Sequence, residues 1–178
     1  MDVRYSPDSV RFARMTTEEV RASFLVDTLF QPDRLTMVYT DVDRAILGSA
    51  VPATKALSLE SAPEIRASTF CERRELGVLN IGGAGTVTVD GTEHPMAARE
   101  ALYVGRGSRA ITFASASVVT PARYYLLSYP AHANHPTAHI ARSEAEVTVL
   151  GALETSNHRT IFKLIHPGRV TTCQLVMG

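Results

Sequence analysis

The sequence has few of the residues and patterns that mark several protein classes. It contains two cysteines, Cys71 and Cys173, and no tryptophan in 178 residues. Two cysteines cannot form the disulfide framework of a small secreted domain. No apolar run reaches the roughly 18 to 20 residues that span a membrane, and Met1 to Met15 lacks the apolar stretch of a signal peptide. We therefore expect a soluble cytoplasmic protein with no membrane partner.

The chain also lacks an excess of charge of either sign. Its 18 basic and 18 acidic side chains give a net charge of zero, which argues against a dedicated nucleic-acid-binding protein. Only Lys55 and Lys163 are lysines, so the other 16 basic residues are arginines. Arginine pairs well with carboxylates and phosphates. The excess of arginine over lysine therefore indicates either an acidic substrate or a coding bias of the genome.

The first segment predicts a short helix. Thr16 and Glu19 have the spacing of a capping box, and apolar residues including Phe24 follow it. We expect the helix to end between Asp27 and Phe30, ahead of a proline. Residues 1–34 are accordingly interpreted as an arm that packs on a larger domain.

From residue 35 onward, the pattern predicts an all-β domain. Short apolar runs recur about every ten residues, each closed by Gly, Pro, Asp or Ser, without helices between them, which is typical of a β-sandwich or small barrel. Asp90-Gly91 predicts a hairpin turn. The predicted strands are Leu35 to Tyr39, Ala45 to Val51, Leu76 to Ile81, Thr86 to Val89, Ala101 to Val104, Ala110 to Ala114 and Tyr124 to Tyr129.

Two motifs suggest ligand binding at first sight. Asn80 to Gly85 is glycine-rich, but a strand follows it where a phosphate loop requires a helix, so we expect a tight turn. His132, His135 and His139 lie within eight residues, and three imidazoles can bind a catalytic zinc. Nearby prolines exclude a helix that would align them. We expect loop histidines, with a metal site as the alternative.

Four consecutive charges, Glu72 to Glu75, open one predicted strand. Because side chains alternate along a strand, two of the four would point toward the mouth of a barrel. We expect a solvated strand end, with a polar rim that recognises carboxylates as the alternative. We take Arg74, Glu75, Tyr103 and Arg109 as candidate pocket residues.

Longer stretches carry a family resemblance. Glu75 to Gly91 and Ala101 to Gly107 have the layout of a cupin half-barrel. The chain as a whole resembles the 5-keto-4-deoxyuronate isomerase family, also called 4-deoxy-L-threo-5-hexosulose-uronate ketol-isomerase. The segments that carry this likeness are Thr36 to Tyr39, Phe70 to Asp90, Ala101 to Gly105, Phe113 to Ser115, Thr155 to Asn157, Arg159 to Ile161 and Thr172 to Leu175.

The resemblance implies a fold and an activity. The fold is a cupin-like β-sandwich with a short N-terminal helical arm. The family is bacterial and cytoplasmic, and it acts in pectin and uronate breakdown as a ketol-isomerase of 5-keto-4-deoxyuronate, a small acidic sugar. Its members are zinc proteins of two cupin-like halves that assemble as homo-oligomers, typically hexamers.

One departure from the family concerns the metal. The family's ligands are a His-x-His…Glu group and a later histidine, all in the second half. If Glu75 were such a glutamate, the histidine places would hold Thr69 and Cys71, or Ser68 and Phe70. Ala110 would replace the later histidine. We therefore expect the zinc ligands to lie beyond Gly178 and no zinc in this chain.

The expected organisation follows from that comparison. Residues 1–34 form the arm, 35–170 the cupin-like domain, and 171–178 the first strand of a missing second half. The chain is then an inactive N-terminal half of the isomerase. The alternative is a stand-alone, metal-free cupin that binds an acidic sugar or acts in assembly without catalysis.

Overall fold

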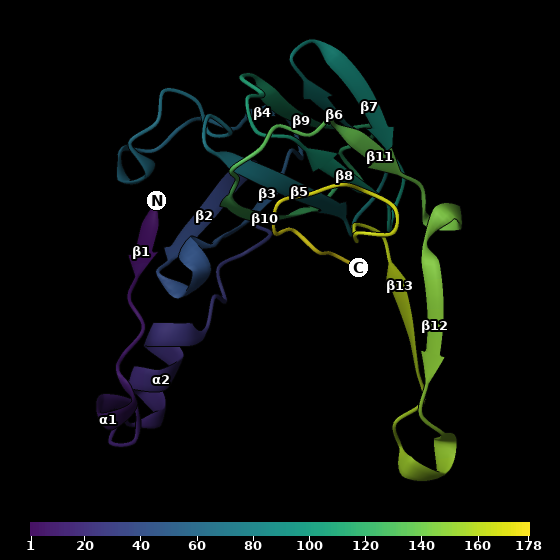
Figure 1. The fold of residues 1–178 in the computed structure, drawn as a ribbon. Helices are drawn as coiled ribbons and strands as arrows, with labels where there is room; N and C mark the ends of the chain where they lie inside the picture. Colours follow the sequence, from purple (N-terminus) through teal and green to yellow (C-terminus); the bar gives the residue numbers. More distant parts are fainter.

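The computed structural model describes residues 1–178. Two of its three β-sheets face each other across one core (Figure 1), and the third is a two-stranded hairpin. The larger sheet has the strand order β1-β2-β3-β10-β5-β8-β11 and the smaller one the order β4-β9-β6-β7. The strands of the larger sheet are β1 (Asp2–Arg4), β2 (Arg34–Thr40), β3 (Ile46–Val51), β5 (Arg74–Asn80), β8 (Ala101–Val104), β10 (Tyr124–Pro130) and β11 (Ala138–Ile140). Those of the smaller sheet are β4 (Leu57–Ser58), β6 (Gly85–Val89), β7 (Thr92–Met96) and β9 (Ile111–Ser115).

The predicted cupin-like sandwich is confirmed. Each of the seven predicted strands corresponds to one observed strand, with bounds that differ by no more than two residues. The predicted hairpin turn is present, because Asp90 and Gly91 both have positive φ angles, 49° and 85°, and β6 pairs with β7 around them. The glycine-rich segment after Asn80 connects β5 to β6 without forming a helix, as expected.

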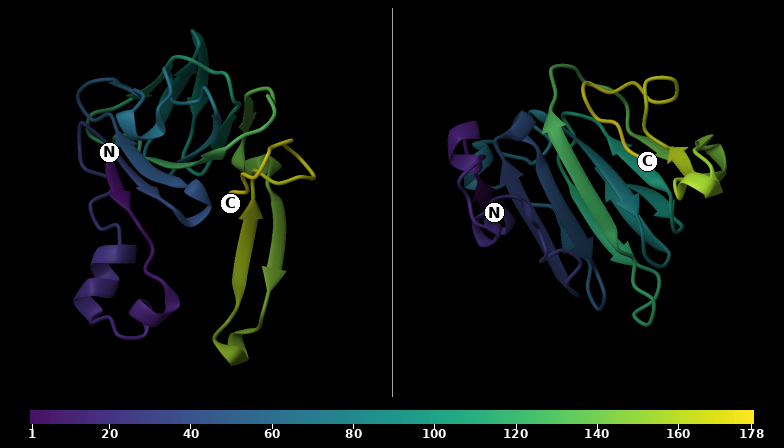
Figure 2. Two further views of the ribbon diagram at one scale, coloured as in Figure 1. Left: turned by 60° about the vertical axis from the view of Figure 1, so that its left-hand side comes forward. Right: turned by 90° about the horizontal axis from the view of Figure 1, so that it is seen from below.

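Strands β5 and β8 of the larger sheet are buried on both faces. On β5, Leu76 and Val78 point into the sandwich core between the two sheets. The opposite face of this sheet carries Tyr103, which belongs to a second apolar cluster with Leu175 and Met177 of the C-terminal segment. The last 15 residues therefore cover the outer face of the sheet, as Figure 2 shows from below.

This C-terminal segment differs locally from the sequence-based expectation. Residues 171–178 were predicted as a strand, but the structure gives them no regular strand and one isolated bridge between Ile165 and Met177. Side-chain and backbone contacts to the sheet surface hold the segment instead.

Two arms extend from the sandwich on the same side (Figures 1 and 2). One contains β1, α1 (Ser9–Phe12) and α2 (Thr17–Phe24), and the other is the hairpin of β12 (Glu146–Leu150) and β13 (Arg159–Lys163). The Thr16–Glu19 capping box is confirmed, but α2 ends at Phe24, earlier than predicted, because Leu25 is extended. No helix has the length and apolarity required to cross a membrane.

Candidate functional site

Strand β5 separates the two most informative candidates, Arg74 and Glu75. As neighbours on one strand, their side chains point to opposite faces of the sheet. Arg74 lies on the same side as Leu76, at the end of the sandwich core, and Glu75 lies beneath the C-terminal segment. The sequence-based expectation that alternation would split this charged block is confirmed.

Glu75 is completely buried, and both of its carboxylate oxygens are engaged. Oε1 accepts hydrogen bonds from the backbone N–H groups of Gln174 and Leu175, at 2.7 and 2.8 Å. Oε2 accepts from the N–H of Cys173 at 2.8 Å and from the hydroxyl of Tyr103 at 2.9 Å. Four donors thus surround one carboxylate, the environment that a buried charge requires.

These contacts indicate a structural role for Glu75 and Tyr103. Burial and the hydrogen bond to Glu75 both raise the pKa of the Tyr103 hydroxyl, so this phenol stays protonated and donates. Neither group has a free lone pair or proton directed at an opening. Their participation in a substrate pocket, which the sequence predicted, stays a prediction.

Arg74 lines a cleft at the end of the sandwich core. The cleft has a volume of about 210 Å³. Its floor includes Tyr39 and Ile65, which also pack against the core cluster. The full lining is Tyr39, Arg44, Glu64, Ile65, Ala67, Arg73, Arg74 and Pro130.

The Arg74 guanidinium is fixed by neutral acceptors alone. Nε donates to the Ser128 hydroxyl at 3.1 Å, and Nη2 donates to the carbonyl oxygens of Ser128 and Arg44, at 2.8 and 2.6 Å. Burial is the main cause that lowers the pKa of Arg74, to about 10, and no carboxylate contributes to the shift. The group therefore remains charged at neutral pH, without an anionic partner.

The backbone around this cleft is unusual. Arg44 and its neighbour Asp43 have φ angles of 53° and 51°, and Arg66 has a φ of 48°. The carbonyl of Arg44 accepts from Arg74, and that of Arg66 accepts from Nη2 of Arg73 at 2.7 Å. Left-handed conformations at non-glycine residues cost free energy and persist where surrounding contacts enforce them. Here they direct carbonyl oxygens at two arginines of the cleft.

Arg109 lies elsewhere. It is exposed and lines a separate opening with Ser68, Thr69, Glu72 and Gly107. Hydrogen bonds from the hydroxyl and the N–H of Ser68 lower the pKa of Glu72 to about 2. The structure therefore does not gather the four candidates into one pocket.

The structure does not gather the three loop histidines into one cluster. Nε2 of His139 lies 3.0 Å from a carboxylate oxygen of Glu100, whereas His132 is exposed and makes no such contact. No group of three or more His, Cys, Asp or Glu side chains lies close enough to hold a metal ion. The main-chain path provides the reason, because β11 (Ala138–Ile140) carries His139 onto the sheet beside β8, away from the loop.

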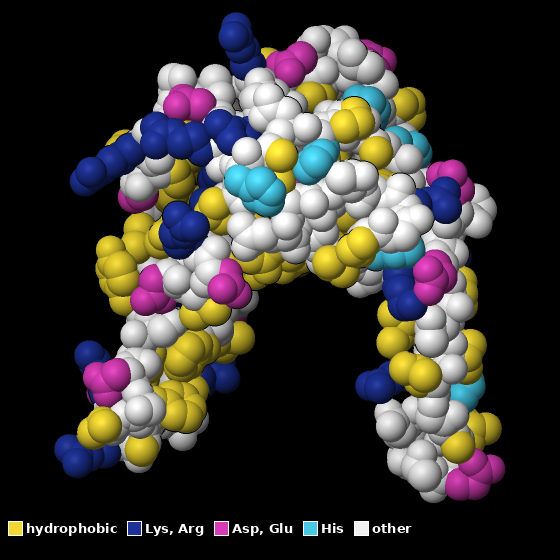
Figure 3. Space-filling model, viewed as in Figure 1, with side chains coloured by type: hydrophobic (Ala, Val, Ile, Leu, Met, Phe, Trp, Pro, Cys, Tyr) yellow, Lys and Arg dark blue, Asp and Glu magenta, His cyan; other side chains and the backbone are white.

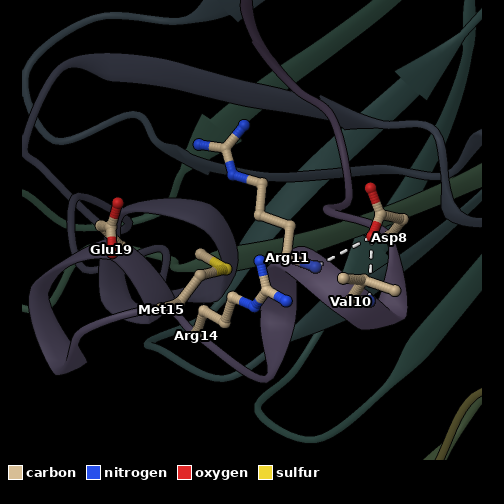
Figure 4. Close-up of a pocket in the computed structure, with 6 residues that line it drawn as sticks. All are labelled: Asp8, Val10, Arg11, Arg14, Met15 and Glu19. Carbon is tan, nitrogen blue, oxygen red and sulfur yellow. Dashed lines mark hydrogen bonds between the residues drawn. The ribbon is translucent and has the colours of Figure 1, made fainter.

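A larger opening lies between the two N-terminal helices (Figure 4) and has a volume of about 650 Å³. The two carboxylates that line it accept hydrogen bonds from backbone N–H groups at the N-terminal ends of the helices. Asp8 accepts from the N–H groups of Val10 and Arg11, both at 2.9 Å, and Glu19 accepts from the N–H of Thr16 at 2.8 Å. This opening offers no nucleophile or base, and we interpret it as a surface depression.

Sequence reasoning missed most partners of the Arg74 cleft. Ser128 is a lone small polar residue in the apolar strand β10, and that position was a usable signal. Tyr39 and Arg44 are brought in by tertiary structure, with no local pattern to mark them.

Comparisons with known proteins agree on one family. The chain is 47% identical over 175 residues to a 4-deoxy-L-threo-5-hexosulose-uronate ketol-isomerase of Formosa agariphila, covering 98% of this chain and 62% of that protein. It is 46% identical to those of Caldicellulosiruptor bescii and Escherichia coli, covering all of this chain and 64% and 65% of those proteins. The chain thus spans just under two thirds of the length of these curated relatives.

A solved structure supports the fold. An IolB-like protein from Salmonella typhimurium superposes with a TM-score of 0.57 at 13% identity, covering 71% of this chain and 46% of that one. The family model described as KduI/IolB matches residues 24–178. With this match and the identities above, the chain belongs to the KduI/IolB family.

Proposed function

We propose that the protein to which this chain belongs is a ketol-isomerase of 4-deoxy-L-threo-5-hexosulose uronate, acting in the cytoplasm in the breakdown of pectin. The identity of 43% to 47% over 98% to 100% of the chain to proteins of that name carries the proposal. The reaction interconverts an aldose and a ketose by moving hydrogen between neighbouring carbon atoms and between their oxygens. It therefore needs a group that stabilises the developing oxyanion and a base near neutral pKa.

Zinc would supply the first of these needs as a Lewis acid. The donor chemistry of these 178 residues does not fit a zinc ion, because zinc requires three or four His, Cys or carboxylate ligands in one place and no such group exists. We therefore assign the zinc ligands to residues outside this set. No catalytic step is attributed to the residues described here.

Genetic complementation tests the proposed activity. The full-length gene of the protein to which this chain belongs is expressed in a bacterium that lacks its ketol-isomerase and is grown on an unsaturated galacturonan oligosaccharide. Restored growth is the expected result. Absence of growth at verified protein levels would overturn the proposal.

A second candidate function is acid binding without catalysis. The observation that favours it is the charged guanidinium of Arg74, whose hydrogen bonds go to neutral oxygens and to no carboxylate. The two candidates differ in turnover, because a binding protein retains sugar-acid affinity and fails to restore growth.

We also propose that the protein is a homo-oligomer, hexameric as the family resemblance implies. The support is the exposure of large apolar side chains on both arms, which are visible in Figure 3. Nine such residues are Tyr5, Val10, Phe12, Phe24, Leu25, Val147, Val149, Leu150 and Leu153. An isolated two-stranded ribbon such as β12–β13 is marginally stable without a packing partner. A single monomeric species in sedimentation velocity at micromolar concentration would contradict this proposal.

A further inference from the structure

We propose that the Arg74 cleft binds the carboxylate of a small sugar acid. The sugar part of this statement rests on the proposed function, whereas the carboxylate part rests on the cleft itself.

The first argument is the missing counter-ion. Arg74 is 7% exposed, and a guanidinium at that depth ordinarily pairs with a carboxylate. Its hydrogen bonds go to one hydroxyl and two carbonyl oxygens, which satisfy Nε and Nη2 but leave a full positive charge. Glu75, the adjacent carboxylate, points to the other face of the sheet and is saturated by four donors.

The second argument is the free edge of the same group. Nη1 of Arg74 donates to no protein atom, whereas the rest of the guanidinium is locked in place. A guanidinium whose orientation is fixed and whose remaining N–H groups are available is preorganised for a carboxylate, since little side-chain entropy is lost on binding.

The third argument is the charge of the rim. Arg44 is exposed on the cleft and its guanidinium has no ion pair, so it adds a second unpaired positive charge. Arg73 is partly neutralised by Glu72, whose Oε1 lies 3.2 Å from its Nε. The acidic residue of the lining, Glu64, lies 3.6 Å from the N-terminal ammonium group. The net positive potential of the cleft therefore favours an anion.

The size of the cleft selects among anions. Its volume of about 210 Å³ is below the roughly 300 to 1,000 Å³ of pockets that enclose drug-sized ligands. A monosaccharide acid fits this scale. The apolar surfaces of Tyr39, Ile65 and Pro130 provide contacts for a sugar ring beside the charged end.

Isothermal titration calorimetry with D-glucuronate tests the assignment, with D-glucose and inorganic phosphate as comparison ligands at constant ionic strength. The variants are Arg74→Gln, which removes the buried charge, and Arg44→Asn, which removes the rim charge at a residue type that tolerates positive φ. Arg109→Asn is the matched control, because it removes an exposed arginine from a different opening. Circular dichroism establishes that each variant is folded.

We expect saturable binding of glucuronate, at least tenfold weaker in Arg74→Gln, about threefold to tenfold weaker in Arg44→Asn, and unchanged in Arg109→Asn. Glucose should not bind. If Arg74→Gln fails to fold, Arg44→Asn decides alone. Three results would overturn the assignment: no saturable binding of glucuronate, an affinity in the two cleft variants equal to that of the wild type, or binding of phosphate as tight as that of glucuronate. Calorimetry measures binding and not turnover, so the two proposals can fail separately. Binding of glucuronate without restored growth would overturn the isomerase proposal and leave the assignment of the Arg74 cleft in place.

Discussion

The Tyr103 hydroxyl on β8 donates a hydrogen bond of 2.9 Å to the Glu75 carboxylate on β5, beneath the C-terminal segment. The same carboxylate accepts three consecutive backbone N–H groups that lie 98 to 100 residues further along the chain. This pair therefore connects the sheet to the segment that covers it. The charge of Glu75 is used to hold structure together, which leaves Arg74 as the charge of this block that is available to a ligand.

Replacement of Glu75 should loosen the C-terminal segment. Glu75→Gln presents an amide N–H₂ to groups that are themselves donors, so we expect a loss of about 2 to 4 kcal/mol in the free energy of unfolding. Tyr103→Phe removes one donor to the carboxylate and should cost about 1 to 3 kcal/mol. Urea denaturation followed by circular dichroism measures both.

Tyr125→Phe is the matched control for these variants. Tyr125 also packs against the C-terminal cluster, on the same face of the sheet, and its hydroxyl makes no hydrogen bond to the protein. Its replacement should be nearly neutral. Hydrogen exchange should show faster exchange of the amides of Cys173, Gln174 and Leu175 in Glu75→Gln. Unchanged protection of these three amides would contradict the role given to Glu75.

The two cysteines should differ in reactivity. Cys71 is completely buried, and burial raises the pKa of its thiol to about 12. At pH 9 only about one molecule in a thousand would carry the thiolate that reacts with iodoacetamide. Cys173 is only partly buried. Peptide mass spectrometry of the folded protein should find the label on Cys173 alone. Label on Cys71 before unfolding would contradict the buried position of the turn that precedes β5.

Acid should weaken the contact between Glu72 and Ser68. Hydrogen bonds from the Ser68 hydroxyl and N–H lower the pKa of Glu72 to about 2 from an ordinary value near 4.5. Because the folded-state pKa is the lower one, the stabilisation is fully present above pH 4.5 and is lost as the pH falls toward 2. The stability difference between wild type and Glu72→Gln should therefore shrink over this window. A difference in the free energy of unfolding between the two proteins that stays constant from pH 6 to pH 3, measured by urea titration, would contradict this role of the Glu72–Ser68 contact.

Much of the fold could be predicted from the sequence, because local patterns determine it. Apolar runs and turn residues located seven strands, and Asp90-Gly91 located the hairpin of the smaller sheet. Strand β7 escaped prediction because it contains Pro95 and polar neighbours. The β12–β13 hairpin escaped prediction because few of its side chains are buried. These elements depend on their partners more than on their own composition.

The site was less predictable, for the same physical reason. Strand alternation correctly separated Arg74 from Glu75. The partners of each come from distant parts of the chain: Ser128 lies 54 residues from Arg74, and Leu175 lies 100 residues from Glu75. Charge alone could not show that both oxygens of the Glu75 carboxylate are occupied by donors, whereas only Nε and Nη2 of Arg74 have protein partners.

We propose that residues 1–178 bind an acidic sugar at Arg74 and do not supply the ligands of a metal centre. The most direct measurement is the zinc content of the 178-residue polypeptide alone, by elemental mass spectrometry on material of verified intact mass after incubation with excess zinc and desalting. The account predicts a value near zero, unchanged in a His132→Ala variant. A value near one, lost in that variant, would contradict it and place a metal site in the loop that carries His132, His135 and His139.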